Sequence, residues 1–556
     1  MTDRFPQPAP GHRDWYTFEA LRALPRILLM VDKNPFSSTY GCFDREYWHY
    51  RTIDFPCGMS QEFGLVLAMA YKHPFPNNPY FGNGRLRELV IGSIEFARDA
   101  SHADSSCDDY FPYERALGAL VFSTYAMTES YIQLGLDRPD LVDFFARRGR
   151  WLIANNESGQ LANHQALAAL ALYNVFLLTG DEAFRKASDE YRDITLSWQN
   201  EEGWYQEYEG ADPGYHSCSI AFLAKLWQKS GDPKILASVG KAIEFASYFM
   251  HPDGSYAGEY GSRNTYHFYP HGFEVFAHAY PTAAKIARTY LQRGLPERRR
   301  YFNDDNRMAA HYVYDWMQSW LDHRSELHTE ALDDNREPFT RWFPNAKMLV
   351  KKTASYYAVA SMAKGGVIKV YDENGPFYSD TGPIAKTERG DVLVSHMVDP
   401  AHRVEADPAT GRFQVSGKMS KRKHQLPSPV KQVAFRAMNL TLGRVNPHLV
   451  RSTLQKILIT GKPRTEMTFT RSFEFGDDAI TIHDRLESGK ADLKLARLAI
   501  ASDATSIYVA NSTNFQESML MPWIEQAEQV EDFNRDHSVQ LPPRVISRAT
   551  CGQPLK

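Results

Sequence analysis

Two short segments about fifty residues apart are near copies of each other, and each has the residues that join one helix to the next. They are residues 177–182 (LLTGDE) and 228–233 (QKSGDP), and residues 133–139 (QLGLDRP) are a weaker relative. In each segment Gly can end a helix in a left-handed conformation and Asp can cap the following helix, and in the segments at 228–233 and 133–139 Pro can occupy the first turn of that helix. The sequence therefore predicts a repeated helical hairpin, and several such hairpins close into an incomplete (α/α) toroid.

The hydrophobic pattern changes once along the chain, from helical up to about Leu321 to alternating from about Tyr356 onward. A chain of 556 residues is also too long for one core. The later runs are separated by turn residues and lack the crossover helices of a parallel sheet. We predict an α+β chain with a toroid over residues 1–323, a linker over 324–345, an antiparallel β-sandwich over 346–525 and an extended tail over 526–556.

Charge and hydropathy exclude several classes of partner. The formal net charge is -4 with mixed signs, which gives no field suited to a nucleic acid or an anionic membrane. No apolar stretch approaches the length that spans a membrane. We therefore expect neither a nucleic acid nor a membrane as partner. The oligomeric state stays open, although an exposed sheet edge often supports a homodimer.

The N-terminus and the cysteines suggest a compartment. The first residues lack a basic region followed by an apolar run, so no secretory signal is visible. The five cysteines show no C-x-x-C spacing, and their odd number argues against a complete set of disulfides. For a complete gene product, this predicts a cytoplasmic protein.

Two predicted helix entrances carry side chains suited to chemistry. Asn163, His164 and Gln165 open one helix, and Tyr215 opens the next. Entrances of this kind converge on one cavity around a toroid. Each residue also has a plainer interpretation, because Asn163 can cap its helix and Tyr215 can be a core aromatic. Their combination at equivalent points of the repeat favours a functional site.

A loop over residues 259–271 is dense in Arg, Asn, Tyr and His and precedes the next predicted helix. Arg263, Tyr266, His267 and His271 suit a substrate-binding loop, and an ordinary polar loop explains them equally well. Trp204 lies just ahead of Tyr215 and fits either a sugar-stacking platform or a packed hairpin loop.

A toroid followed by an antiparallel sheet, with Asn-His at one helix entrance and Gly-Tyr at the next, resembles the heparinase II/III-like and alginate lyase-like group of polysaccharide lyases. The resemblance is most specific between about Trp151 and Tyr280. It implies a carbon-oxygen lyase that cleaves at the C4 oxygen of a uronic acid by β-elimination and leaves a 4,5-unsaturated uronate. The implied partner is a uronate-containing oligosaccharide or polysaccharide.

The chemistry assigns roles to these residues. Removing the C5 proton puts a second negative charge beside the uronate carboxylate, so Asn163, His164 and Arg263 are candidates to hold that carboxylate. Tyr215 can take the C5 proton and protonate the leaving oxygen if both lie on one face of the sugar. If they lie on opposite faces, His164 would be the base and Tyr215 the acid. The catalytic candidates are Tyr215, His164, Asn163 and His267, and the substrate-binding candidates are Arg263, Gln165, Tyr266, His271 and Trp204.

Neither route needs a cofactor, but some members of the group hold a structural metal ion in the β domain. His396, His448, His483 and Asp484 raise that question here, and no pair among them has a recognisable ligand spacing.

Three other functions stay open. A uronyl C5-epimerase begins with the same proton abstraction, and a non-catalytic glycan-binding protein would keep the groove without turnover. A glycoside hydrolase needs two opposed carboxylates, and residues 201–212 offer no convincing pair.

Overall fold

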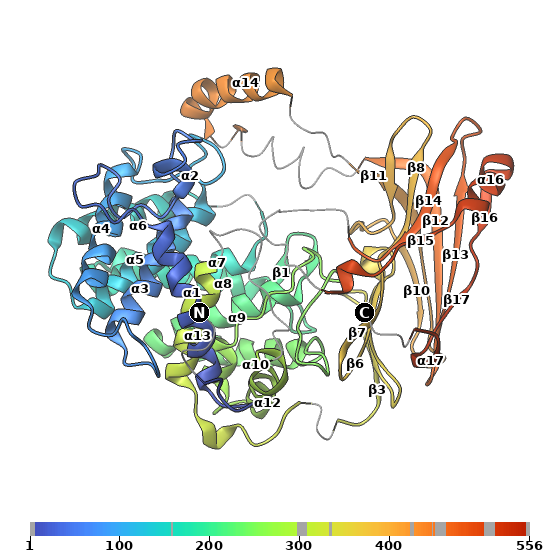
Figure 1. Cartoon of the computed structure of the whole chain (residues 1–556), viewed down its shortest axis with the longest axis horizontal. Helices are drawn as coiled ribbons and strands as arrows, with labels where there is room; N and C mark the ends of the chain where they lie inside the picture. Colours follow the sequence, from blue (N-terminus) through green and yellow to red (C-terminus); the bar gives the residue numbers. More distant parts are fainter. Residues whose placement is uncertain are drawn as a thin grey trace.

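The computed structural model describes residues 6–156, 159–296, 309–332, 336–422, 428–447, 449–450, 463–504 and 517–551. A helical half, formed by the N-terminal part of the chain, lies beside a β half formed by the C-terminal part (Figure 1). The predicted order of a helical region followed by antiparallel sheets is confirmed. Within the described residues, no helix combines the length and apolar character needed to cross a membrane.

The helical half is built mostly from antiparallel neighbours in sequence, such as α7 with α8 and α9 with α10. The α-helices are α1 (Asp14–Met30), α2 (Arg45–Trp48), α3 (Phe63–Lys72), α4 (Gly84–Ala100), α5 (Leu117–Leu134), α6 (Pro139–Ala154), α7 (Ala162–Thr179), α8 (Glu182–Ser197), α9 (Pro213–Ser230), α10 (Pro233–Ser247), α11 (His271–Phe276), α12 (Pro281–Thr289) and α13 (Ala309–Asp322). Short helical turns η1 (Gly58–Glu62), η2 (Tyr290–Gly294) and η4 (Ser325–Leu327) join some of them. The first helix, α1, packs against the last, α13.

The two strongest predicted hairpin turns are confirmed. Gly180 and Gly231 end α7 and α9 with φ angles of 69° and 67°, in the left-handed region where a side chain is disfavoured. The carboxylate of Asp181 then accepts from the backbone N–H of the second residue of α8, and Asp232 does the same for α10. These caps satisfy backbone donors that a helix start otherwise leaves unmet.

The weaker third turn differs from the prediction at its cap. Gly135 ends α5 in the left-handed region, as expected. Arg138, rather than Asp137, is the N-cap residue of α6, and it makes no side-chain cap hydrogen bond. Two extra residues lie between Gly and Pro in this segment, Leu136 and Arg138, and Arg138 takes the position before Pro139 that Asp232 has before Pro233.

The β half contains two antiparallel sheets. Five strands follow one another in sequence order in the first sheet: β3 (Phe339–Phe343), β4 (Met348–Lys352), β5 (Tyr357–Ser361), β6 (Val367–Asp372) and β7 (Gly375–Asp380). The second sheet has ten strands among the described residues, in the order β15-β14-β8-β9-β11-β12-β13-β16, with β10 beside β11 and β17 beside β13. They are β8 (Gly382–Thr387), β9 (Val392–Val394), β10 (Arg403–Asp407), β11 (Arg412–Lys421), β12 (Arg464–Phe475), β13 (Ile480–Ser488), β14 (Leu495–Ala501), β15 (Ile524–Glu525), β16 (Ser538–Gln540) and β17 (Arg544–Ile546).

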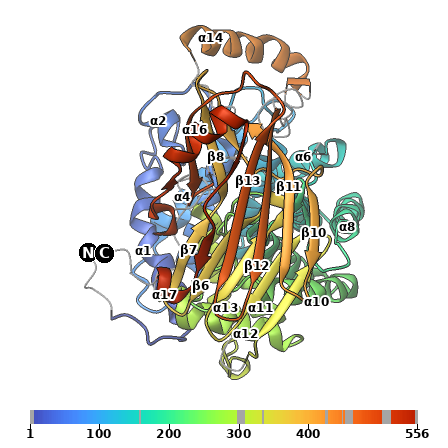
Figure 2. The same ribbon diagram turned by 90° about the vertical axis from the view of Figure 1, so that its right-hand side faces the viewer.

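The five-stranded sheet is buried on both faces. Along β5, Tyr357 and Val359 belong to the apolar core shared with the helices, whereas Ala358 and Ala360 belong to the core shared with the ten-stranded sheet. Successive side chains of a strand point to opposite faces, which explains this division. The ten-stranded sheet forms the outer layer, on the side away from the helices (Figure 2).

Three segments differ from the sequence-based boundaries. β3 and the turn after it lie within residues predicted as a linker. Residues 527–551, predicted as an extended tail, form α16 (Ala527–Asp536), β16, β17 and α17 (Arg548–Cys551). The apolar side chains of Phe533, Val539 and Ile546 anchor this segment in the sheet core, and both strands pair with β13.

The third difference is a helix between β11 and β12, α14 (Pro429–Met438), followed by the turn η6 (Asn439–Gly443). It extends over the edge of the helical half (Figure 1). There the ring of Phe435 contacts the ring of Phe111 at a centroid distance of 5.6 Å, and Arg436 pairs with Asp54. The two halves of the molecule are therefore joined at this edge as well as along the five-stranded sheet.

Candidate active site

The entrance to α7 is held by a carboxylate from another part of the chain. Oε1 of Glu207, in the short strand β1 (Gln206–Glu207), accepts from the backbone N–H of Asn163 at 3.0 Å and from its Nδ2 at 2.8 Å. Both side chains are fully buried. The N-cap residue of α7 is Leu161, so the interpretation of Asn163 as a simple helix cap is wrong.

The same glutamate pairs with the predicted loop arginine. Nη1 of Arg263 lies 3.2 Å from Oε2 of Glu207, and both groups are buried. Burial raises the pKa of Glu207 above its ordinary value, and Arg263 and Asn163 offset only part of this effect. Burial alone would lower the pKa of Arg263, but Tyr215, Tyr208 and Glu207 outweigh it and raise the pKa. Arg263 is therefore a fixed positive charge.

Tyr215 lies between this cation and a histidine. The guanidinium carbon of Arg263 is 3.8 Å from the centroid of the Tyr215 ring. The His267 ring contacts the Tyr215 ring edge-on, with the ring centroids 5.1 Å apart. Burial and the charge of Arg263 lower the pKa of His267 to about 3. His267 is thus a neutral imidazole at physiological pH, and its Nδ1 shares a hydrogen bond with the Tyr312 hydroxyl.

Asp212 fixes the backbone around these groups. It is the N-cap residue of α9, where Oδ1 accepts from the backbone N–H of Tyr215 at 3.0 Å. Its Oδ2 accepts from the backbone N–H of Arg263 at 2.9 Å, and the Thr265 hydroxyl donates to the same carboxylate. The start of α9 and the loop that carries Arg263 are therefore held as one unit. Gly214 is required there, because a Cβ at this position would lie 2.1 Å from Oγ1 of Thr265.

His164 lies at the edge of the cluster and is half-buried. Its ring contacts Phe122 edge-on at 5.8 Å, and Phe122 stacks on His311 at 4.2 Å. His311 in turn shares a hydrogen bond of 2.7 Å with Glu62. Since the other members of the cluster are buried, His164 marks the side on which the cluster comes nearest to the surface.

Four predicted residues make contacts elsewhere. Gln165 donates to Asn156 at 3.0 Å, and Nε2 of His271 shares a hydrogen bond of 2.7 Å with Asp322 at the end of α13. Trp204 is only 6% exposed and lines a cavity of about 170 Å³ between the two halves. Tyr266 accepts from Lys369 of the five-stranded sheet.

The β half thus holds the loop that carries Arg263 and His267. Nζ of Lys364 donates to the carbonyl oxygens of Glu259 and Gly261, the latter at 2.9 Å. Nζ of Lys369 lies 2.6 Å from Oε2 of Glu259 and donates to Tyr266. Both lysines are buried, and burial lowers the pKa of Lys364 to about 7.

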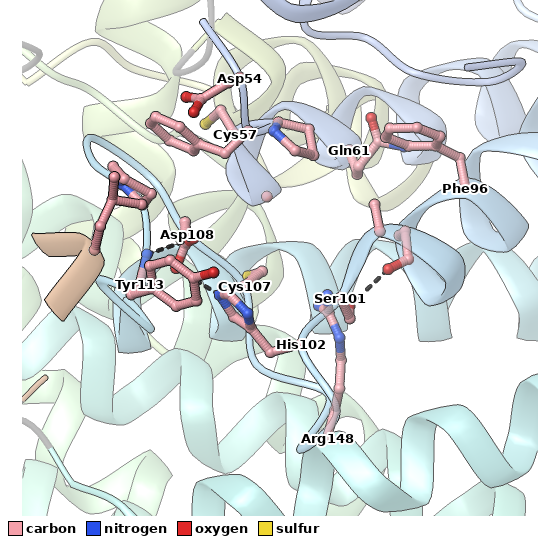
Figure 3. Close-up of a pocket in the computed structure, with 17 residues that line it drawn as sticks. Asp54, Cys57, Gln61, Phe96, Ser101, His102, Cys107, Asp108, Tyr113 and Arg148 are labelled. Atoms are coloured by element: carbon pink, nitrogen blue, oxygen red, sulfur yellow. Dashed lines mark hydrogen bonds and ion pairs between the residues drawn. The ribbon is translucent and has the colours of Figure 1, made fainter. Parts of the chain in front are cut away.

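A separate cavity of about 260 Å³ is lined by η1, the end of α4 and the loop after it (Figure 3). Arg148 is buried in its wall and donates to the hydroxyls of Ser123 at 2.7 Å and Ser101 at 3.2 Å. None of the nine predicted site residues lines this cavity. The turn η1 links this cavity to the cluster, because its last residue is Glu62, which shares a hydrogen bond with His311.

The residues proposed for a metal in the β half do not converge among the described residues. Asp484 faces Arg544 and Arg471 instead, neither His396 nor His483 belongs to a convergent group of three metal-ligand side chains in the described part of the chain, and His448 lies outside the described residues. Burial, with the charge of Lys364, lowers the pKa of His396 to about 3.

Sequence reasoning did not identify Glu207, Asp212 and Tyr312 as residues of this cluster. Asp212 had a usable signal, because Asp-Pro at 212–213 repeats the cap of α10 at 232–233. Glu207 and Tyr312 act through contacts that span 44 and 45 positions of sequence, for which no local pattern exists.

No protein-family model matches this sequence, and no curated protein matches it. A likeness exists among solved structures. The chondroitin AC lyase of Streptomyces coelicolor A3, solved in complex with chondroitin sulphate, is similar with a TM-score of 0.54 and 10% identity, over 90% of this chain and 69% of that chain. An unsaturated glucuronyl hydrolase of Streptococcus agalactiae matches over 56% of this chain and 91% of that chain at 10% identity, with a TM-score of 0.37. The second score is too low to support a conclusion, whereas the first confirms the predicted resemblance at the level of the fold.

Proposed function

We propose that this chain is a lyase that acts on uronate-containing glycans by β-elimination. The observation that carries the proposal is the buried cluster of Asn163, Tyr215, Arg263 and His267 in the helical half. These groups provide a fixed cation, an amide, a phenol and a neutral imidazole at one place. The fold adds support for a glycan-active enzyme, because the similar solved structure is a chondroitin AC lyase bound to chondroitin sulphate.

Arg263 and Asn163 would receive the uronate carboxylate. Within the described residues, Nε of Arg263 is buried and makes no hydrogen bond, whereas Glu207 accepts from Nη1 of Arg263 and from Nδ2 of Asn163. The Nδ2 amide of Asn163 has a second hydrogen that it can donate to a carboxylate. A buried donor without a partner costs about 1–3 kcal/mol, so a ligand carboxylate that meets Nε gains that stabilisation. The positive charge of Arg263 would also stabilise the negative charge of the enolate-like state that follows loss of the C5 proton.

Tyr215 would transfer the proton. If ionised, its phenolate can accept the C5 proton and return it to the leaving C4 oxygen, and the guanidinium over its ring would stabilise that negative charge. When the two atoms lie on opposite faces of the sugar, a second group is needed on the other side. Two imidazoles are candidates for that step: His267, which is neutral, and His164, which is half-buried.

A uronyl C5-epimerase is the second candidate. It is favoured by the pairing of Tyr215 and His267, two acid-base groups with ring centroids 5.1 Å apart, since an epimerase must remove a proton from one face and return it to the other. Only the lyase forms a new double bond.

The test is ultraviolet absorbance of the purified protein incubated with a panel of uronate-containing oligosaccharides and polysaccharides. We expect a rise from the conjugated C4-C5 double bond with wild type and a loss of at least about 100-fold in rate with Tyr215→Phe. Tyr205→Phe is the matched control, because this tyrosine is also buried and its hydroxyl binds Ser238 at 2.7 Å, away from the cluster.

The alternatives give different results in the same samples. Deuterium incorporation at C5 without a rise in absorbance would establish the epimerase. Binding of a glycan with neither signal, unchanged by Tyr215→Phe, would leave a non-catalytic glycan-binding protein and overturn the lyase proposal.

A further inference from the structure

Glu274, His323 and His328 form a second cluster of functional side chains, in the helical half and apart from the Tyr215 cluster. One donor atom from each lies within 4.8 Å of the other two, and all three side chains are buried. Among the described residues, this is the one group of three such donors that converges. Neither the proposed lyase chemistry nor the sequence patterns account for it.

The distances within this cluster are compatible with a metal ion after small shifts of the side chains. Nδ1 of His323 and Nε2 of His328 lie 3.0 Å and 2.9 Å from the same oxygen, Oε2 of Glu274. Donors that surround Zn²⁺ at about 2.0–2.2 Å in a tetrahedron are roughly 3.3–3.5 Å apart, so small outward shifts would seat an ion between them. His323 donates a hydrogen bond to the carboxylate, whereas His328 is at contact distance without the geometry of one.

The chemistry of the donor set also fits a transition metal. Imidazole nitrogens and one carboxylate oxygen are preferred ligands of Zn²⁺, and four residues separate His323 from His328, a spacing common among paired zinc histidines. No lysine or arginine pairs with Glu274 among the described residues. A divalent ion would supply positive charge to this buried carboxylate.

A neighbouring hydroxyl orients the carboxylate. Tyr16 is fully buried and donates to Oε1 of Glu274 at 2.7 Å, which leaves Oε2 directed at the two histidines. Outer hydrogen bonds of this kind fix the orientation of metal ligands. Tyr16 belongs to α1, Glu274 to α11, and His323 and His328 flank η4 just after α13. The cluster therefore joins the first and last helices of the helical half.

We infer that Glu274, His323 and His328 bind one divalent transition-metal ion, with Zn²⁺ as the expected occupant, where the first and last helices of the helical half meet. Its role is structural, because the donors are buried and the ion ties α1, α11 and the segment after α13 together. The site is independent of the proposed lyase activity, so either proposal can fail without the other.

The first experiment is metal analysis of untagged, full-length protein by mass spectrometry after loading with Zn²⁺ and removal of excess ion. We expect about one ion per chain in wild type and at least a tenfold loss in Glu274→Gln and His328→Ala. His278→Ala is the matched control, because His278 also lies in the helical half but stacks on Trp227 and binds the Val275 carbonyl. It should keep the full metal content.

A second measurement covers the case in which the ligand variants do not fold. Wild-type protein stripped with a chelator and titrated with Co²⁺ should develop the visible absorption bands of a four-coordinate Co²⁺ site at about one equivalent, and Zn²⁺ should abolish them. The melting temperature should rise when the metal is returned. Tyr16→Phe should weaken metal affinity by about 10–100-fold while the bands persist at high Co²⁺.

Three results would overturn the inference. The first is wild-type protein that binds neither Zn²⁺ nor Co²⁺ and melts at the same temperature with and without chelator, which would leave a hydrogen-bonded histidine-carboxylate cluster. The second is metal content that is unchanged in folded Glu274→Gln and His328→Ala, which would place any ion elsewhere. The third is a Co²⁺ spectrum typical of six oxygen ligands, as expected for adventitious surface binding.

Discussion

The guanidinium of Arg263 stacks on the ring of Tyr215, with 3.8 Å between the guanidinium carbon and the ring centroid. The same group lies 3.2 Å from Oε2 of Glu207. One buried cation therefore neutralises a carboxylate and faces the proposed proton-transfer residue. Arg263 therefore contributes both to stability and to the proposed activity, and variants of Arg263 and Glu207 can separate the two contributions.

Replacing Arg263 by Met should damage both properties. It leaves Glu207 as a buried, unpaired charge, which costs about 3–5 kcal/mol of folding free energy. It also removes the cation proposed to hold the substrate carboxylate, so turnover should fall by at least about 100-fold. In the double variant Arg263→Met with Glu207→Gln the charge is gone, so denaturant unfolding should show most of the stability restored while the absorbance assay stays negative. Wild-type turnover in Arg263→Met would contradict the assigned role.

Asn163→Asp should make stability depend on pH in a new way. The new carboxylate would lie close to Oε1 of Glu207, where the amide nitrogen now lies at 2.8 Å. Two adjacent carboxylates raise the pKa of the pair in the folded state above its unfolded value. The folded state then binds the extra proton more tightly, so the variant should be near wild-type stability at about pH 4 and lose stability as the pH rises through the raised pKa. Urea unfolding at several pH values measures this, and Asn163→Ala, which adds no charge, should lose about 1–3 kcal/mol with a weaker dependence on pH than Asn163→Asp.

Gly214→Ala should destabilise the site by a steric effect. The added Cβ would lie 2.1 Å from Oγ1 of Thr265, whose hydroxyl is held by Asp212, so the loop must shift. Overpacking of this kind costs about 1–3 kcal/mol. Gly84→Ala is the control, since that glycine opens α4 and has nothing within 4 Å of the added atom. Equal thermal stability of the two variants would show that the loop is not constrained by Asp212.

Acid should destabilise the protein before the carboxylates titrate. Burial lowers the pKa of His216 to about 4, and the pKa values of His267 and His396 to about 3. These histidines stay neutral when folded but bind a proton when unfolded, where their pKa is about 6.5. Their contribution is therefore present above about pH 6.5 and is lost as the pH falls toward the folded values, with a slope of about 1.4 kcal/mol per pH unit for each group.

The matching variant is His216→Gln, since His216 contacts only backbone groups of Tyr205 and Ala242 through its ring nitrogens and is outside the proposed chemistry. Urea unfolding between pH 4.5 and 7.5 should show a slope shallower by about 1.4 kcal/mol per pH unit than in wild type. An unchanged slope would mean that His216 is protonated in the folded state.

Local rules predicted the repeated turns of the helical half well. Gly180 acts through its own backbone conformation, and Asp181 acts on the first turn of the helix that follows it. The same rules were misleading at Asn163, where a carboxylate 44 positions away takes the role expected of a helix cap. They also missed α14 and the pairing of residues 538–546 with β13, because Val539 and Ile546 become informative only when a partner strand is present. The spacing of His323 and His328 was visible in the sequence, but Glu274 completes the group only in three dimensions.

The contacts of Lys364 and Lys369 have a consequence for the order of folding. The helical hairpins can form from neighbouring segments, and these local contacts form early. The segment with Arg263 and His267 is held by Lys364, which contacts Glu259 across 105 positions of sequence, so its final geometry awaits a turn synthesised later. During synthesis the helices therefore precede the completed loop, and the geometry of the proposed site is among the last features that the chain acquires.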